Sequence, residues 1–270
     1  MIHVDIRGSG RELVFLHGAP QGPYDLEPLV APFRVDHRVA LVHLPGYGDT
    51  PPIESDYDMV AVARELADEL AAAGITSPVL VGMSAGAYRC LELALEPGDM
   101  SPRGLFLIGP FAELEEPERE GFRGFGVAME AGADLLDLAV ARLLGRAWVE
   151  AHPDVASRVA AHILKSVDRR GVRAEFDAFA DSADLLERAS DLDIPTYLRV
   201  GEEDQATPVV HAERLAARLP DTTLEVVPGR GHLLHHEDLE ATLEALRGFV
   251  TTRCRADHVR HKSCLPRLLK

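Results

Sequence analysis

The chain has 270 residues, of which 46% are hydrophobic and 27% are charged, so it can form a globular domain with a sizeable core and is not expected to be disordered. Its formal net charge of −16 argues against nucleic acid or an anionic membrane as the main partner, because neither attracts an acidic protein. The charge is uneven. Residues 253–270 hold six basic residues and one acid, and form a basic C-terminal tail.

The cysteines and the first residues indicate the compartment. Three cysteines, Cys90, Cys254 and Cys264, do not make a paired disulfide framework. Residues 1–6 lack the basic and apolar character of a signal segment, and no apolar run approaches the roughly 18 residues of a membrane-spanning helix. We therefore expect a cytoplasmic protein.

Short apolar runs rich in Val, Leu and Ile alternate with stretches of helical periodicity, which is typical of βα units around a parallel sheet. The predicted strands are residues 2–6, 13–17, 39–44, 79–81, 105–108, 196–200 and 223–227. The predicted helices between them are residues 58–73, 85–95, 209–218 and 239–250. Gly74 stands at the end of the first of these helices, and Asp238 stands where the last one needs an N-cap.

The 87 residues between the fifth and sixth strands exceed what one crossover needs. Helical spacing recurs there at 129–145, 147–165 and 172–189. We predict a helical cap at 111–195, inserted into a core formed by 1–110 and 196–252, with the tail at 253–270. Such a cap is either a second packing layer or, as we prefer, a lid over the residues that follow the fourth strand.

Those residues are Gly82-Met83-Ser84-Ala85-Gly86. A serine on a sharp turn from strand to helix is exposed at the carboxyl edge of a sheet, and the flanking glycines allow the strand and helix to pack closely. The pattern alone is weak because such matches often mark loops. Ser84 is therefore a candidate nucleophile whose partners have to be found elsewhere in the chain.

A serine hydroxyl needs a general base, which in turn needs an acid that orients it. His232 follows the last predicted strand in Pro228-Gly229-Arg230-Gly231-His232, and Asp204 follows the strand before it. Glu202 and Glu203 offer the same chemistry as Asp204, but the position favours Asp204. The resulting order along the chain is nucleophile, acid and base.

A serine hydrolase also needs two N–H donors for the developing oxyanion. The loop His17-Gly18-Ala19-Pro20 follows an early strand and offers the amide of Ala19, while Ala85 directly after the predicted nucleophile offers the other. Pro20 has no N–H and can only shape the loop. We expect His17 to hold this loop through hydrogen bonds.

These motifs together resemble the α/β-hydrolase superfamily over about residues 1–250, with Pro45-Gly46-Tyr47-Gly48 as a further matching loop. The chain looks most like small serine esterases and enol-lactone hydrolases related to 3-oxoadipate enol-lactonase. The resemblance implies an α/β-hydrolase fold, a mostly parallel sheet flanked by helices with an inserted helical cap. Two departures stand out. Members of the superfamily usually open with two strands before the strand that precedes the oxyanion loop, whereas only residues 2–6 are available here, so we expect the first antiparallel edge strand to be absent. The tail has no counterpart; it is either a partner-binding extension or, as we prefer, a segment without a functional role.

Neighbouring chemistries fit less well. Dehalogenases and epoxide hydrolases of this fold resemble one another in placing a carboxylate where this chain has Ser84. Epoxide hydrolases also use tyrosines of the cap, whereas all five tyrosines of this chain lie outside the predicted cap, which counts against epoxide opening. The cluster His235-His236-Glu237 looks like a set of metal ligands, but adjacent side chains at a helix start diverge, and we interpret the three as surface residues. No metal or cofactor is expected.

The sequence therefore predicts a cofactor-free serine hydrolase that cleaves a small ester or lactone through an acyl-enzyme. Its catalytic residues would be Ser84, Asp204 and His232, with the oxyanion hole at Ala19 and Ala85. Acyl transfer, thioesterase or perhydrolase activity on the same residues stays open, as does a non-catalytic binding protein of this fold. Five cap arginines are candidates for meeting a substrate carboxylate: Arg142, Arg146, Arg169, Arg170 and Arg173.

Overall fold

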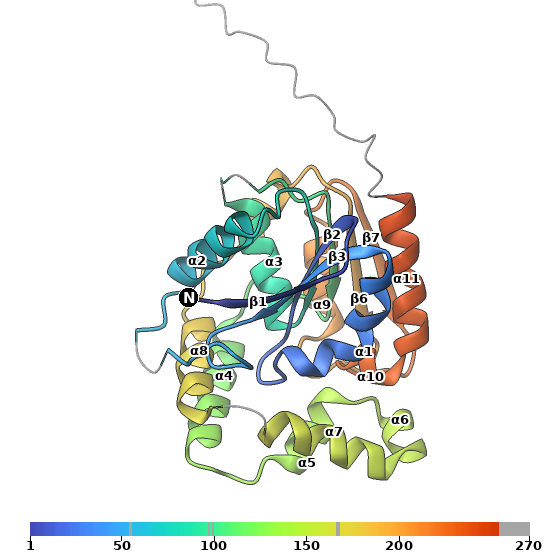
Figure 1. Ribbon diagram of the computed structural model, residues 1–270. Helices are drawn as coiled ribbons and strands as arrows, with labels where there is room; N and C mark the ends of the chain where they lie inside the picture. The colour runs from blue at the N-terminus through green and yellow to red at the C-terminus, as the bar shows by residue number, and fades with distance from the viewer. Residues whose placement is uncertain (54–55, 97, 99, 166–167, 254–270) are drawn as a thin grey trace, which may run out of the picture.

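The computed structural model describes residues 1–53, 56–96, 98, 100–165 and 168–253, and within them one twisted sheet runs through the molecule (Figure 1). Its order is β1-β3-β2-β4-β5-β6-β7. Six strands are parallel, and β1 pairs antiparallel with β3 at one edge. The strands are β1 (His3–Arg7), β2 (Arg11–Leu16), β3 (His37–His43), β4 (Val79–Met83), β5 (Gly104–Ile108), β6 (Thr196–Gly201) and β7 (Thr222–Val227).

All seven predicted strands are confirmed, and a single strand precedes β2 in the described chain, as expected. The basic tail beyond Arg253 lies outside the described residues, together with Cys254 and Cys264. Cys90 is buried, and burial raises the pKa of its thiol well above the ordinary value. None of the described helices combines the length and the apolar character that a bilayer crossing requires.

The core helices lie where periodicity predicts them: α2 (Met59–Ala72), α3 (Ala85–Leu95), α9 (Val209–Ala216) and α11 (Leu239–Thr252). Asp58 caps α2 by accepting hydrogen bonds from two backbone amides of its first turn. Gly74, with a φ of 72°, ends the same helix. Asp238 does occupy the N-cap position of α11, but its carboxylate pairs with Arg199 instead of capping the helix.

Alternate residues of the central strands face opposite layers of the molecule. In β2, Val14 and Leu16 join the core cluster shared with α2 and α3, whereas Leu13 and Phe15 join the cluster shared with α1 (Glu27–Val30) and α11. Figure 1 shows these two pairs of helices on opposite sides of the sheet. Since both faces are covered, the central strands β4 and β5 are buried and apolar along their whole length.

The segment between β5 and β6 is helical, as predicted, but its helices differ from the prediction. They are α4 (Glu116–Glu130), α5 (Leu136–Leu143), α6 (Arg146–Ala151), α7 (Pro153–Lys165) and α8 (Arg169–Ala180), followed by the 3-10 helix η3 (Glu187–Asp191). In Figure 1, α5, α6 and α7 lie below the carboxyl edge of the sheet, and α4 packs along α8.

Local signals explain the corrected boundaries. The predicted helix at 129–145 is interrupted at Gly132, whose φ is 72°, and the one at 147–165 is divided before Pro153. The one at 172–189 starts earlier, because Asp168 caps α8, and ends at Ala180. The unpredicted α4 begins at a capping box formed by Glu115 and Glu118.

The turn after β4 leaves no space for a side chain at Gly86. A Cβ there would lie 2.2 Å from Leu16 O and 2.6 Å from His17 O, whereas a Cβ at Gly248 in α11 would meet nothing within 4 Å. We expect Gly86→Ala to lower the free energy of unfolding by about 1 to 3 kcal/mol, because α3 has to move away from the end of β2.

Gly248→Ala is the matched control, and we expect it to raise that free energy by about 0.5 to 1 kcal/mol, because alanine favours a helix interior. Urea denaturation of both variants measures the difference. Equal stability of the two would contradict the tight contact at Gly86.

Candidate active site

Ser84 lies at the turn between β4 and α3 in a strained backbone conformation, with φ 53° and ψ −118°. The turn is tight: Ser84 N donates to Ile108 O at 2.8 Å, and a Cβ on Gly82 would lie 2.5 Å from Gly86 O. The N-terminus of α3 follows directly, and its positive end favours negative charge beside Ser84. The serine therefore projects from a rigid turn at the carboxyl edge of the sheet.

The two predicted partners of Ser84 are paired with each other. Asp204 follows β6 and His232 follows β7, and His232 Nδ1 lies 2.7 Å from Asp204 Oδ2. Both residues are at most 2% exposed. The other carboxylate oxygen accepts hydrogen bonds from Ala206 N at 2.9 Å and Thr207 N at 2.8 Å. Because a carboxylate only accepts, Nδ1 carries the proton and Nε2 keeps its lone pair.

Thr207 also belongs to the site, although the sequence analysis did not single it out. Its hydroxyl lies 2.9 Å from Gly109 O, 3.1 Å from Asp204 Oδ2 and 3.2 Å from His232 Nδ1. The threonine therefore connects the acid, the imidazole and the end of β5. Its spacing of three residues from Asp204, within one turn, is the signal that could have identified it.

The end of β5 brings the imidazole and the serine to the same edge of the sheet. A Cβ on Gly109 would lie 2.8 Å from two atoms of the His232 ring, and the neighbouring Ile108 accepts the hydrogen bond from Ser84 N. Among the residues that the structure describes, no hydrogen bond joins Ser84 Oγ to His232. Catalytic hydrogen bonds are often long without substrate and shorten when it binds.

The loop after β2 lies directly beside Ser84. A Cβ on Gly18 would be 3.2 Å from Ser84 Cβ. His17 holds this loop as expected: its Nδ1 donates to Gly18 O at 2.8 Å, and its Nε2 accepts from Leu44 N at 3.1 Å. Burial lowers the pKa of His17 to about 4, so the ring stays neutral. Ala19 follows on the same loop, and Ala85 is the first residue of α3, where backbone N–H groups have no partner within the helix.

Tyr47 and Glu175 connect this loop to the inserted helices. The Tyr47 ring packs edge-on against His17, with centroids 4.7 Å apart, and its hydroxyl donates to Glu175 Oε2 of α8 at 2.5 Å. Glu175 is fully buried, and burial raises its pKa to about 7 despite the hydrogen bond from Tyr47 and the nearby Arg89. No local pattern in the sequence indicates this pair, because 128 residues separate the two.

The interpretation of His235, His236 and Glu237 as surface residues is wrong. His235 is 1% exposed and Glu237 5%, because the chain after His232 turns inward before α11. Both histidine Nε2 atoms donate to Asp25, each at 2.7 Å, and these contacts hold the pKa of Asp25 well below its usual range although burial opposes this.

The geometry of this cluster fits a hydrogen-bonded group better than a metal centre. The possible ligand atoms of Asp25, His235 and His236 lie close enough to one another to surround a metal ion. A metal-bound imidazole, however, donates its second N–H to a partner, and the buried Nδ1 of His235 has none in the described chain.

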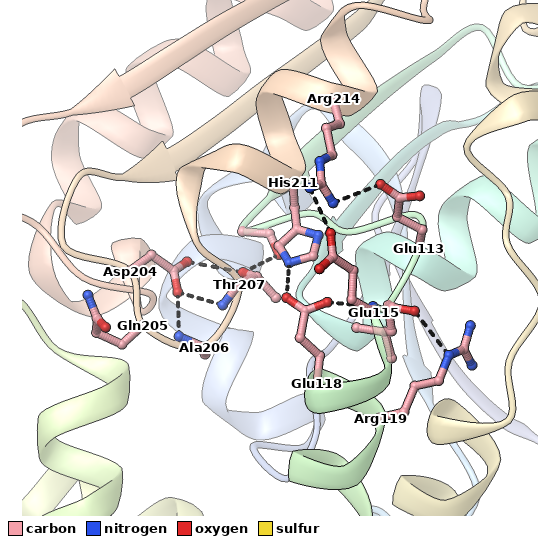
Figure 2. Close-up of polar contacts among 12 residues, drawn as sticks. Glu113, Glu115, Glu118, Arg119, Asp204, Gln205, Ala206, Thr207, His211 and Arg214 are labelled. Atoms are coloured by element: carbon pink, nitrogen blue, oxygen red, sulfur yellow. Dashed lines mark hydrogen bonds and ion pairs between the residues drawn. The ribbon is translucent and has the colours of Figure 1, made fainter.

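Figure 2 shows how α4 is fixed beside the loop that carries Asp204. His211 of α9 contacts Glu118 of α4 through Nε2 and Oε1 at 2.7 Å. Arg214, one turn further along α9, binds Glu113 at 3.1 Å and Glu115 at 2.7 Å. We call residues 202–208, between β6 and α9, the acid loop. The start of the insertion is thus attached to the helix that follows the acid loop.

A hollow of about 600 Å³ lies between the start of α2 and α8, and no member of the Ser84, Asp204 and His232 set lines it. Arg170 and Arg173 line it, whereas Arg142 and Arg146 lie at the acid loop instead. Arg142 donates to Gln205 O at 3.0 Å, and Arg146 N donates to Glu203 at 2.7 Å. The five cap arginines therefore do not form one group.

Comparison with known proteins identifies the family. A model of the alpha/beta hydrolase family matches residues 13–245, which is most of the chain. The chain belongs to the alpha/beta hydrolase family. This α/β-hydrolase has the fold that the sequence predicted: a mostly parallel sheet of seven strands within the described residues, flanked by helices and carrying a helical insertion.

Its similarities are to esterases and related hydrolases. It is 28% identical to the pimeloyl-[acyl-carrier protein] methyl ester esterase of Xanthomonas campestris pv. campestris, over 92% of this chain and 98% of the relative. A non-heme haloperoxidase of Rhodococcus erythropolis is 26% identical over 83% and 86% of the two chains. A thermophilic esterase from Thermogutta terrifontis superposes with a TM-score of 0.83 at 24% identity, covering 94% of each chain.

The raised pKa of Glu175 predicts a pH-dependent stability. A carboxyl group with a higher pKa in the folded state contributes stability below its unfolded pKa, and that contribution is lost as the pH rises through about 7. Glu175→Gln removes the titration. As the pH rises from 4.5 to 8, the unfolding free energy of the variant should therefore rise by about 3 kcal/mol relative to that of wild type.

Urea denaturation at both pH values measures this change, and the exposed Glu240→Gln is the control, for which no such trend is expected. A stability difference for E175Q that does not vary with pH would contradict the raised pKa.

Proposed function

We propose that this α/β-hydrolase is a serine hydrolase that cleaves a small ester or lactone through an acyl-enzyme, without a cofactor. The observation that carries the proposal is the buried pair of His232 and Asp204, 2.7 Å apart, at the same sheet edge as the strained Ser84. A protein that only bound a ligand would have no need of a buried acid and base beside an elbow serine. The similarity to esterases supports the same reaction class.

The first half of the reaction forms the acyl-enzyme. Ser84 Oγ attacks the carbonyl carbon while His232 Nε2 takes its proton, and Asp204 stabilises the resulting imidazolium through Nδ1–H. The amides of Ala19 and Ala85 hold the oxyanion, and each such donor typically lowers the barrier by about 3 kcal/mol. The intermediate then collapses, the bond to the leaving alcohol breaks, and His232 returns the proton to that oxygen.

The second half repeats these steps with water. His232 removes a proton from water as its oxygen attacks the acyl carbon, and the second oxyanion occupies the same two amides. Collapse breaks the bond to Ser84 Oγ, which recovers its proton from His232. The acid leaves, and a lactone substrate leaves as the open hydroxy acid.

The substrate class is set by the insertion, which lies across the carboxyl edge of the sheet in Figure 1. The guanidinium of Arg142 donates to Gln205 O of the loop that carries Asp204, so Arg142 is the cap arginine best placed for a carboxylate on the substrate. This placement favours carboxylated lactones, the substrate type of the enol-lactone hydrolases that the sequence resembles. Small uncharged esters are the alternative within the same mechanism.

A second candidate is transfer of the acyl group to an acceptor other than water, such as a peroxide. The similarity to a non-heme haloperoxidase favours it. The two activities share the acyl-enzyme and differ only in the nucleophile that releases it. Product analysis with water and hydrogen peroxide in competition separates them.

Replacement of the nucleophile tests the reaction. Ser84→Ala should reduce the hydrolysis of p-nitrophenyl acetate by at least about a thousandfold while the thermal unfolding midpoint stays near that of wild type, because the acyl-enzyme cannot form. The exposed Ser9→Ala is the control and should keep full activity.

Labelling with a fluorophosphonate gives an independent readout, since only an activated serine reacts. Mass spectrometry should place the label on Ser84 in wild type and find none there in S84A. A wild-type protein that never reacts at this residue would exclude the proposed mechanism.

Ester and lactone panels test the substrate class. Arg142→Ala should lower kcat/KM for a carboxylated lactone by about tenfold, the size of a single exposed charge contact, and leave p-nitrophenyl acetate unaffected. The control is Arg158→Ala, an exposed change in α7. An equal loss on both substrates would indicate damage to the acid loop rather than recognition of the carboxylate.

A further inference from the structure

The turn between α5 and α6 lies in direct contact with the loop that carries His232. Leu143 O accepts hydrogen bonds from His232 N at 2.9 Å and from Leu233 N at 3.2 Å. A Cβ on Gly231 would lie 2.5 Å from Gly145 N, so the two backbones meet without an intervening side chain. We call residues 143–146 the cap turn and residues 229–233 the base loop.

One buried carboxylate joins these two segments. Glu237 Oε2 accepts from Gly145 N of the cap turn at 2.9 Å and from Gly231 N of the base loop at 2.9 Å. Glu237 is 5% exposed, so both bonds form away from water, where an unpaired N–H is costly. Gly231 directly precedes His232, so its position also sets that of the imidazole.

The same two segments are fixed on their other sides. Arg146 N of the cap turn donates to Glu203, the residue before Asp204, at 2.7 Å. Glu203 N in turn donates to Arg230 O of the base loop at 2.8 Å. The cap turn, the base loop and the acid loop therefore form one hydrogen-bonded group, and Glu237 is the member that binds two of them with a single oxygen.

We propose that Glu237 is a positioning residue for His232 and that it couples the seating of the cap turn to the geometry of the base. When the cap turn moves away, Glu237 loses one of its two donors and His232 N loses Leu143 O, so the base loop is released. A substrate that holds the cap turn in place keeps the imidazole aligned. This inference rests on the proposed function, and it assigns Glu237 no contact with the reacting atoms.

The test compares three variants on p-nitrophenyl acetate. Glu237→Met keeps the length of the side chain but removes the acceptor, and should lower kcat by about ten- to a hundredfold with a KM within threefold of wild type. Glu237→Gln keeps an oxygen that can accept both N–H groups, and should retain at least a third of the wild-type kcat. Glu240→Ala, an exposed change in α11, should retain full activity.

An E237M protein that is folded and keeps the wild-type kcat overturns the proposal. Equal losses of kcat in E237M and E237Q also overturn it, because rescue by the amide oxygen is what separates positioning from a general effect of the charge. If E237M does not fold, Glu237→Ala replaces it, since the space left admits water that can bind the two N–H groups.

Hydrogen exchange tests the coupling without reference to turnover. In E237M, peptides covering the cap turn and the base loop should both exchange at least threefold faster than in wild type. Faster exchange in neither or in only one of them overturns the coupling. If both peptides exchange faster in E237M but wild type does not react with the fluorophosphonate at Ser84, the coupling stands and the proposed function is rejected. Failure of the coupling and failure of the proposed function are therefore distinguishable.

Discussion

The site depends on the contact between the start of α3 and the end of β2, where no side chain fits. Gly86 lies so near Leu16 O and His17 O that the backbone of the helix is in direct contact with the backbone of the strand, with no side chain between them. This contact places the residues after β2 next to Ser84 and sets the direction in which the serine leaves the sheet. Strain at Ser84 is maintained because the surrounding elements are buried on both sides of the sheet.

Much of this arrangement follows from short-range patterns. The apolar runs predict the central strands, because a strand covered on both faces is apolar along its length. The edge strands β1 and β7 are partly exposed and carry polar residues between their apolar ones. Asp204 and His232 were found from their positions after consecutive strands, since the carboxyl ends of parallel strands meet at one edge. The five-residue motif at Ser84 could be interpreted as the site of a nucleophile only together with Asp204 and His232, because the same motif also occurs in ordinary loops.

What the sequence could not predict is contact between distant segments. Glu175 looks like an exposed helix residue until α8 is packed against Tyr47, and Asp25 looks like a turn residue until His235 and His236 reach it across 210 residues or more. The helix boundaries of the insertion failed for a different reason. Amphipathic spacing continues through Gly132 and across Pro153, so periodicity alone merges helices that the backbone separates.

The attachment of the cap turn to the base and acid loops uses mainly backbone atoms on the cap side: Leu143 O, Gly145 N and Arg146 N. Mutations that change side chains on α5, α6 and α7 therefore leave these bonds available. Sequence changes in those helices can accumulate while the contacts with the base and acid loops stay intact. An insertion attached in this way can diversify in evolution faster than the sheet and loops on which it lies.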